Sequence, residues 1–298
     1  MARTFTFKKL DAFAAGASSG NPAGVVYLSP EETLCEAEML QIAQELKGFV
    51  SEVGYVRLPK SGRLELRYFS SEREVEFCGH ATIAICADIL QTRPEWADLE
   101  QLTLQINSGE LRAYNRMKDE GAVYISAPPP RPNPRVPEPG ALAQALGIAT
   151  AQLNPNAPLA ILNGGLETII VPLDGLETCL GLKPDLETLN IYCQSQGADI
   201  LICYSNQTVD PASHYRTRVF APTFGYLEDP ATGSGNAALG YHLLNLGVWD
   251  GSPLLIEQSG EREAFNRVKL GTQGEGPERR ILIGGGAICR IEGIYRLA

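Results

Sequence analysis

The chain has 298 residues, of which 44% are hydrophobic and 20% charged, a composition typical of a globular protein with one large or two ordinary domains. Its formal net charge of -10 gives no general attraction to nucleic acid or to an anionic membrane surface, so we expect neither as a partner. The first residues, MARTFTFKKLDAF, alternate apolar and polar side chains, so we expect no signal peptide or membrane span and a cytoplasmic protein.

The first part of the chain alternates strand and helix patterns. Alternating apolar residues predict strands at 3–12, 23–28, 52–58, 63–70, 101–107, 110–117 and 121–126. A helix is predicted over 31–47, with Ser29 and Glu32 as a capping box. A second helix, ATIAICADIL at 81–90, is apolar on nearly every side except at Asp88. A helix without a polar face must be surrounded, so we expect the strands to wrap around it.

A proline-rich stretch follows these elements. Seven of the chain's 20 prolines fall in APPPRPNPRVPEPG, residues 127–140, which predicts a stiff connector because proline fixes φ and donates no hydrogen bond. We place the domain boundary there, with halves at 1–128 and 129–298, and allow a last strand at about 285–298 to return to the first half. Beyond the connector, further elements are predicted at 166–172 (strand), 185–196 (helix), 199–205 and 215–222 (strands) and 236–247 (helix), before several final strands.

The two halves resemble each other in sequence. An offset of 154 residues aligns CGHATIA with TGSGNAA and so places Cys78 on Thr232. Because the order of elements also agrees, we expect an internal duplication in which each half curls around one buried helix. The same offset places Glu52 on Asn206, so only one half would carry this acid.

The stretches GHAT and GSGN are each expected to begin one of the buried helices, facing a shared cleft. Unpaired N–H groups at a helix start bind anions, and glycine lets a ligand approach the backbone. Alternatively, the glycines only serve tight strand-to-helix turns. His80 lies in the first turn, where it would form hydrogen bonds or relay a proton, or be structural.

Two further residues are candidates for acid–base chemistry. Cys78 is either a thiol activated by the helix start or a small buried side chain, and its mate Thr232 does not support a symmetric two-thiol racemase. Glu52, in FVSEVGYV, has apolar neighbours, and burial would raise its pKa into the range of a general acid or base; the alternative is an exposed edge-strand carboxylate. Cys78 and His80 have no third ligand nearby in the sequence, so we expect no metal site.

The segment EDPATGSGN before the last predicted helix is dense in polar groups. We expect its side chains to form a polar wall towards a ligand, although each is also explained as a turn or cap residue. These residues are Glu228, Asp229, Thr232 and Ser234.

Five motifs together resemble the PhzF family, named for a phenazine-biosynthesis isomerase. They are GNPAGVV at 20–26, SEVGYV at 51–56, EVEFCGHATIA at 74–84, FAP at 220–222 and EDPATGSGNAAL at 228–239. The resemblance implies an α+β, diaminopimelate epimerase-like fold of two pseudo-symmetric halves, each with a curled β-sheet around a central helix and the active site between them. It also implies a homodimer that isomerises trans-2,3-dihydro-3-hydroxyanthranilate or a similar small cyclic carboxylate without cofactor or metal.

The resemblance also assigns roles to single residues. Glu52 falls on the family's catalytic glutamate, and His80 and Asp229 would orient the substrate or relay protons. The implied substrate contacts are Asn21, Ser51, Gly79, Thr232, Gly233 and Ser234, with Cys78 as a possible alternative acid or base.

The sequence departs from the family pattern in two places, which leaves the substrate open. The family's Q-x-S-x-R-G-G stretch is replaced by QSGEREAFN at 258–266, and GSGNAA stands where GSA is common. A second hypothesis is therefore a hydroxyproline dehydratase or epimerase that uses Cys78 and Thr232. A third is a catalytically idle ligand-binding homodimer, which has no need of a buried acid at Glu52.

Overall fold

The computed structural model describes residues 3–297, which form two compact units. Unit 1 comprises the described parts of 1–14, 19–125 and 284–298, and unit 2 comprises 15–18 and 126–283. The sequence-based division at 128 differs from these units in placing the short segment 15–18 with the first half. No helix within residues 3–297 is long and apolar enough to span a membrane.

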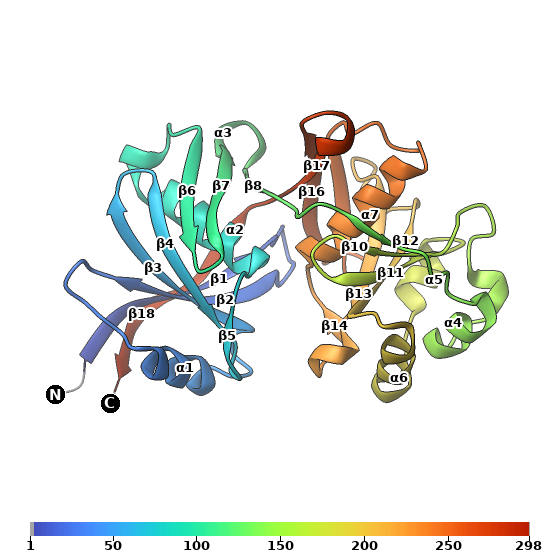
Figure 1. Ribbon diagram of the computed structural model, residues 1–298, viewed down its shortest axis with the longest axis horizontal. Coiled ribbons are helices and arrows are strands. Elements are labelled where there is room, and N and C mark those ends of the chain that lie inside the picture. The colour runs from blue at the N-terminus through green and yellow to red at the C-terminus, as the bar shows by residue number, and fades with distance from the viewer. Residues whose placement is uncertain (1–2, 298) are drawn as a thin grey trace. The chain divides into compact units, whose positions relative to one another are not determined.

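Unit 1 is a strongly curved sheet that encloses one helix (Figure 1). The hydrogen-bonded order is β18-β1-β2-β3-β4-β6-β7-β8, in which β2–β3 and β4–β6 are parallel and the other pairs antiparallel. Its strands are β1 (Arg3–Ala12), β2 (Asn21–Leu28), β3 (Glu52–Lys60), β4 (Arg63–Phe69), β5 (Glu74–Val75), β6 (Gln101–Ile106), β7 (Gly109–Arg116), β8 (Ala122–Ser126) and β18 (Ala287–Leu297). Its helices are α1 (Glu36–Glu45), α2 (Gly79–Thr92), η1 (Pro94–Trp96) and α3 (Met117–Glu120).

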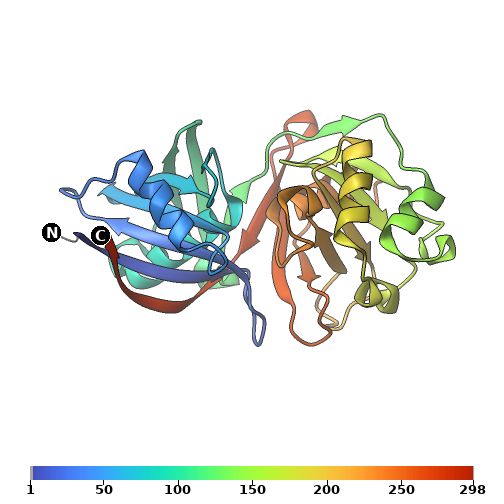
Figure 2. The same ribbon diagram turned by 90° about the horizontal axis from the view of Figure 1, so that it is seen from below.

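The two ends of the chain meet in unit 1. Strand β18 pairs along its whole length with β1, so that Leu297 lies opposite Arg3. Figure 2 shows this red strand beside the dark blue one. The sheet therefore closes with residues that are almost the full chain apart in sequence.

Helix α2 confirms the prediction of a surrounded helix. All residues from Ala81 to Leu90 are buried. The one acid among them, Asp88, accepts hydrogen bonds from the Lys8 ammonium at 3.0 Å and from the Tyr27 hydroxyl at 2.5 Å. A buried charge is tolerated only when it is paired in this way.

Helix α1 begins later than predicted. Ser29 and Glu32 do interact, since the Ser29 N–H donates to the Glu32 carboxylate at 2.6 Å, but they close a separate turn. The helix starts after Cys35, whose N–H donates to Glu38 at 2.8 Å. The sequence contains two possible cap sites six residues apart, Ser29 and Cys35, and the second is the one that continues into an amphipathic helix.

Unit 2 repeats this plan. Its order is β9-β10-β11-β12-β13-β15-β16, with β11–β12 and β13–β15 parallel. Its strands are β9 (Arg131–Asn133), β10 (Ala160–Asn163), β11 (Glu167–Pro172), β12 (Ile200–Ser205), β13 (Tyr215–Phe220), β14 (Glu228–Asp229), β15 (Leu254–Gln258), β16 (Asn266–Gln273) and β17 (Arg280–Gly285). Its helices are α4 (Pro139–Leu146), η2 (Thr150–Gln152), α5 (Leu176–Gly181), α6 (Leu186–Gln196), η3 (Pro222–Phe224), α7 (Gly233–Asn245) and η4 (Gly276–Glu278). Helix α7 is the enclosed helix, buried from Gly235 to Leu243.

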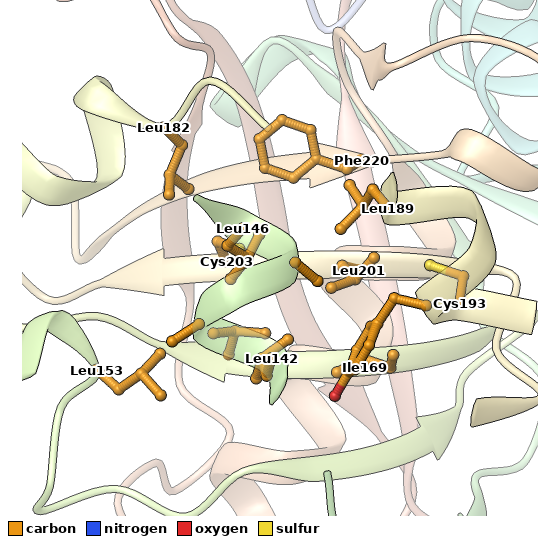
Figure 3. Close-up of a cluster of buried hydrophobic side chains, with 14 of the residues drawn as sticks. Leu142, Leu146, Leu153, Ile169, Leu182, Leu189, Cys193, Leu201, Cys203 and Phe220 are labelled. Carbon is orange, nitrogen blue, oxygen red and sulfur yellow. The ribbon is translucent and has the colours of Figure 1, made fainter. Parts of the chain in front are cut away.

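The proline-rich connector is more structured than predicted. It contains strand β9, in which Pro132 lies opposite Leu162 of β10, and it leads into α4. Pro139 occupies the first helical position of α4, and the Glu138 carboxylate caps two N–H groups. Helices α4 and α6 pack their apolar side chains against β11 and β12 (Figure 3). Proline is compatible with β9 because the strand is short and pairs with only one described neighbour.

The strand ladders confirm the duplication and correct one of its details. In each unit three residues lie opposite one another across three strands. The matched sets are Val53, Phe69 and Glu74 in unit 1 and Leu201, Phe220 and Glu228 in unit 2. Glu52 therefore corresponds to Ile200, and the predicted match with Asn206 is wrong because the loops before the helices differ in length. Unit 2 carries no acid at this position.

An arginine–glutamate pair that the sequence pattern did not predict, which we call the arginine clamp, also repeats in the two units. In each unit an arginine donates to both carboxylate oxygens of the glutamate four residues before the N-cap of the enclosed helix, at 2.7–2.8 Å. The same guanidinium lies 5.0–5.3 Å from a phenylalanine ring two residues along its strand. The matched sets are Arg67, Glu74 and Phe69 in unit 1 and Arg218, Glu228 and Phe220 in unit 2. The clamp fixes the short strand that leads into each helix start.

Candidate active site

The start of α2 is held rigidly in unit 1. Cys78 is the N-cap residue, with extended backbone, and Gly79 and His80 form the first turn. The Thr82 hydroxyl donates to the Cys78 carbonyl at 2.7 Å and lies 2.6 Å from the hydroxyl of buried Tyr68. These bonds tie the first turn of the helix to the sheet behind it.

The glycines at the two helix starts do not serve strained turns. Neither Gly79 nor Gly233 has a positive φ, and a Cβ on either would make only ordinary contacts, at 3.8 Å and 3.4 Å respectively. Neither backbone strain nor close packing therefore explains why glycine occurs at these two positions. This favours the hypothesis that the side chain is absent to let a ligand approach the helix N–H groups.

Glu52 begins β3 and reaches the start of α2. Its Oε2 lies 3.3 Å from His80 Nε2 and 3.9 Å from Cys78 Sγ. Only 26% of the Glu52 side chain is accessible, and burial raises its pKa to about 7, while the hydrogen bond from Cys78 acts in the opposite direction. The raised pKa that its apolar neighbours predict is confirmed. Near neutral pH this carboxyl can both accept and donate a proton.

Cys78 is placed against the imidazole of His80 and does not form a nucleophile–base pair with it. Its sulfur is 3.4 Å from Nδ1 and 3.9 Å from Nε2, so it is nearly equidistant from the two ring nitrogens. A hydrogen bond in the ring plane to Nδ1 would leave Nε2 much farther away, because the nitrogens are on opposite sides of the ring. The thiol therefore lies over the ring and is buried, with 7% exposure. This geometry supports the packing role of Cys78 over the catalytic one.

A third possible donor, which the sequence neighbourhood of Cys78 and His80 lacks, lies close to both residues in the fold. One donor atom from each of Glu52, Cys78 and His80 lies within 4.8 Å of the others. Glu52 comes from 26 residues earlier in the chain, and only the pairing of β2 with β3 and the packing of α2 bring it close. Sequence spacing could not show this neighbour.

Two other predicted contacts in unit 1 lie near the start of β3. Asn21 begins β2 and is buried, with 3% exposure. Ser51 is exposed, and its N–H donates to the Pro22 carbonyl at 3.1 Å. Ala23 of β2 lies opposite Glu52 in the parallel ladder. Asn21 is therefore two residues from this position on β2, and Ser51 directly precedes Glu52 on β3.

The start of α7 is organised by Gln258, at the end of β15. This fully buried amide accepts from Thr232 N–H at 3.0 Å and from the Asn236 side chain at 2.7 Å. It donates to the Asp229 carbonyl at 2.8 Å and lies 3.2 Å from Thr232 Oγ1. All four hydrogen-bonding positions of the amide are in use. Gln258 therefore positions the DPATG turn at residues 229–233. The sequence alone did not predict this role.

Three of the four members of the predicted polar wall have partners within unit 2. Glu228 belongs to the arginine clamp with Arg218. Thr232 is buried, with 6% exposure, and its hydroxyl is 2.5 Å from an Asp229 carboxylate oxygen. Gly233 and Ser234, in contrast, are partly exposed in the first turn of α7. Which of these residues face a ligand stays a prediction.

The segment that departs from the family pattern is anchored by Arg216. This residue is completely buried and forms an ion pair of 3.0 Å with Glu257, also completely buried. It donates to the carbonyls of Ser259, at 3.0 Å, and Glu261. Buried Arg216 therefore fixes the backbone of the loop after β15, and this in turn keeps Gln258 in place.

The chain matches the family described as phenazine biosynthesis-like protein (PhzC-PhzF) over residues 10–293. It is 31% identical over 286 residues to the uncharacterized isomerase YfhB of Bacillus subtilis (strain 168), covering 94% of each chain. It is 29% identical over 258 residues to a trans-2,3-dihydro-3-hydroxyanthranilate isomerase of Pseudomonas fluorescens, covering 85% of this chain and 84% of the relative.

Solved structures share the fold. A PhzF-family phenazine biosynthesis protein of Bacillus anthracis superposes with a TM-score of 0.87 at 24% identity, covering 98% of this chain and 99% of that one. A hydroxyproline epimerase of Agrobacterium vitis superposes with a TM-score of 0.61 at 12% identity, covering 99% and 91%. The predicted α+β, diaminopimelate epimerase-like fold is thereby confirmed.

Proposed function

Because the chain belongs to the PhzC-PhzF family of phenazine biosynthesis-like proteins and is an isomerase, we propose that it moves a proton between two carbons of a small cyclic carboxylate with Glu52 as its single acid and base. The observation that carries this proposal is the Glu52 carboxyl, buried beside His80 with a pKa raised to about 7. No cofactor is needed in this scheme, because the same carboxyl removes the proton and returns it.

The chemistry follows from the position of the acid. The ionised Glu52 takes a proton from one ring carbon, the electron pair delocalises over the unsaturated system, and the carboxylic acid then protonates another carbon on the same face. A carboxyl with a pKa near the working pH does both steps well, because neither protonation state is strongly favoured. His80, 3.3 Å away, would hold the Glu52 side chain in place and bond polar groups of the substrate.

The substrate class comes from the helix starts and from a relative. The first turn of α2 offers N–H groups at Gly79 and His80 for a substrate carboxylate. The relative named trans-2,3-dihydro-3-hydroxyanthranilate isomerase supports trying that compound and other dihydroaromatic carboxylates. The predicted roles of Asn21, Ser51, Thr232, Gly233, Ser234 and Asp229 towards the substrate stay predictions.

Solvent deuterium tests the proposal. When the chain is incubated with a dihydroaromatic carboxylate in deuterated water, we expect deuterium at one ring carbon, and Glu52→Gln should lose labelling by at least about 100-fold, the lower end of a general acid–base contribution. Binding, measured by calorimetry, should survive. Glu76→Gln is the matched control, since Glu76 is exposed in the loop before Cys78.

The same assay separates the alternatives. Turnover that survives Glu52→Gln but fails in Cys78→Ala would replace the proposal with a hydroxyproline dehydratase or epimerase. The geometry favours this less, because the Cys78 sulfur lies over the His80 ring and the Thr232 hydroxyl already bonds Asp229. Tight binding without any labelling would indicate an idle binding protein. The homodimer and the cytoplasmic location stay predictions, the first of which sedimentation velocity tests directly.

A further inference from the structure

Glu52, Cys78 and His80 present three different donor atoms to one small volume of unit 1. We infer that these residues bind Zn²⁺, and that the ion shuts off the proposed proton transfer. A thiolate, an imidazole nitrogen and a carboxylate oxygen are the three kinds of ligand that zinc takes in proteins. Among residues 3–297, these are the donors of this kind that come within 4.8 Å of one another as a group of three.

The distances fit a tetrahedral ion. Zinc bonds of about 2.3 Å to sulfur and about 2.0–2.2 Å to nitrogen and oxygen place the donor atoms about 3.3–3.6 Å apart at tetrahedral angles. The observed separations are 3.3 Å between His80 Nε2 and Glu52 Oε2, and 3.9 Å from Cys78 Sγ to each of these atoms. The sulfur must move closer by a few tenths of an ångström. The imidazole must also turn so that a nitrogen points at the ion.

The surroundings suit an open three-ligand site. Cys78 is the N-cap of the buried helix α2 and His80 lies in its first turn, which the hydrogen bond from the Thr82 hydroxyl to the Cys78 carbonyl holds in place. Glu52 begins the adjoining strand β3. One thiolate and one carboxylate balance the charge of the ion, so its burial leaves no net charge unpaired. Three protein ligands leave a fourth position for water, as in zinc sites that are not purely structural.

The consequence for activity rests on the proposed function. A Glu52 carboxylate bound to zinc is a much weaker base for the substrate proton, because the ion stabilises the ionised carboxylate, and the ion also occupies the space beside His80. Zinc should therefore inhibit reversibly, and a chelator should restore the exchange reaction.

Binding is measured without any substrate, so that this inference and the proposed function can fail separately. Zinc is titrated into the purified, reduced chain in competition with a chromophoric chelator, and we expect one tight ion per chain. Cys78→Ala, His80→Ala and Glu52→Gln should each weaken binding by at least about 10-fold, the minimum seen for lost metal-site interactions. The matched control is the double variant Cys35→Ala/Cys289→Ala, which removes the two exposed thiols and should bind as tightly as the parent.

Cobalt tests the site without any substitution. Co²⁺ added to the unmodified chain should give intense tetrahedral d–d bands and a thiolate charge-transfer band, both abolished by an equivalent of zinc. Octahedral spectra without the thiolate band would overturn the inference. So would zinc binding that is lost in the Cys35→Ala/Cys289→Ala variant, or that persists at full strength in all three site variants.

Discussion

The buried acid Glu52 makes a prediction about stability that needs no substrate. Its pKa rises from 4.5 to about 7 on folding because burial penalises the carboxylate. Below pH 4.5 both the folded and unfolded chains hold the proton, so there is no cost. Between pH 4.5 and 7 the unfolded chain ionises first, and the free energy of unfolding falls. Above pH 7 the cost is constant.

The size of this effect follows from the shift. Each pKa unit corresponds to 1.36 kcal/mol, so the full shift would cost about 3 kcal/mol above pH 7. Since 26% of the side chain remains accessible to water, we expect the observed cost to be nearer about 2 kcal/mol. Glu52→Gln removes the titration, so the variant should gain about 2 kcal/mol over the parent between pH 4.5 and pH 8.

The assay follows unit 1 alone. The chain has two tryptophans, Trp96 in unit 1 and Trp249 in unit 2. In a Trp249→Phe background, urea unfolding followed by the fluorescence of buried Trp96 reports unit 1. The titration is repeated at several pH values from 4.5 to 9 for both parent and Glu52→Gln.

The control substitution, Glu74→Gln, should change the free energy of unfolding in the opposite direction to Glu52→Gln. The hydrogen bond from Arg67 lowers the pKa of Glu74, so its stabilising contribution is present above pH 4.5 and is lost only as the pH falls further. Glu74→Gln should therefore be less stable than the parent by a constant amount from pH 5 to 9. A stability difference between Glu52→Gln and the parent that does not change with pH would refute the assignment of a raised pKa to Glu52.

Three further predictions concern activity and packing. Isomerase-type exchange should rise with pH through about 7 and then level, as the Glu52 carboxylate forms, and a flat profile in steady-state rates would contradict this. Gln258→Leu should lower the free energy of unfolding by about 2–4 kcal/mol in urea titrations, because it removes four hydrogen bonds and leaves the buried Thr232 N–H without its acceptor, whereas an unchanged midpoint would show that the turn does not depend on it. Gly164→Ala should lower the free energy of unfolding by about 1–3 kcal/mol, because its Cβ would lie 2.8 Å from the backbone nitrogen of Ala238. The Cβ of Gly181→Ala would meet nothing, so this control should be neutral when the two variants are compared by thermal melts.

Some features of the site could be predicted from the sequence because they depend on local pattern. The apolar run after Gly79 has no polar face, so α2 had to be enclosed, and the same run after Gly233 gave the second enclosed helix. The 154-residue offset located both N-cap residues, Cys78 and Thr232, because no insertion separates the short strands from the helices. The start of β3 at Glu52 also followed from alternation alone.

Other features depended on contacts between residues far apart in the chain. The offset that matched the helices failed at Glu52, whose true counterpart is Ile200, because loop lengths between strands are not constrained by the core. The grouping of Glu52 with Cys78 and His80 arises only when β3 packs beside the start of α2. Gln258 looked like one polar residue at a strand end until folding placed it within hydrogen-bonding distance of the turn at Asp229.

The amino-acid sequence by itself thus determined which residues begin helices and strands, since caps and periodicity act over a few positions. It also supplied every reactive group of the candidate site. Only the tertiary structure decided which of these groups are free to take part in chemistry and which are paired or packed within the protein. It turned Glu228 towards Arg218 and laid the Cys78 thiol over the His80 ring, and it left Glu52 buried enough to hold its proton near neutral pH. Availability depends on burial and on long-range partners, and neither is written in the local pattern of residues.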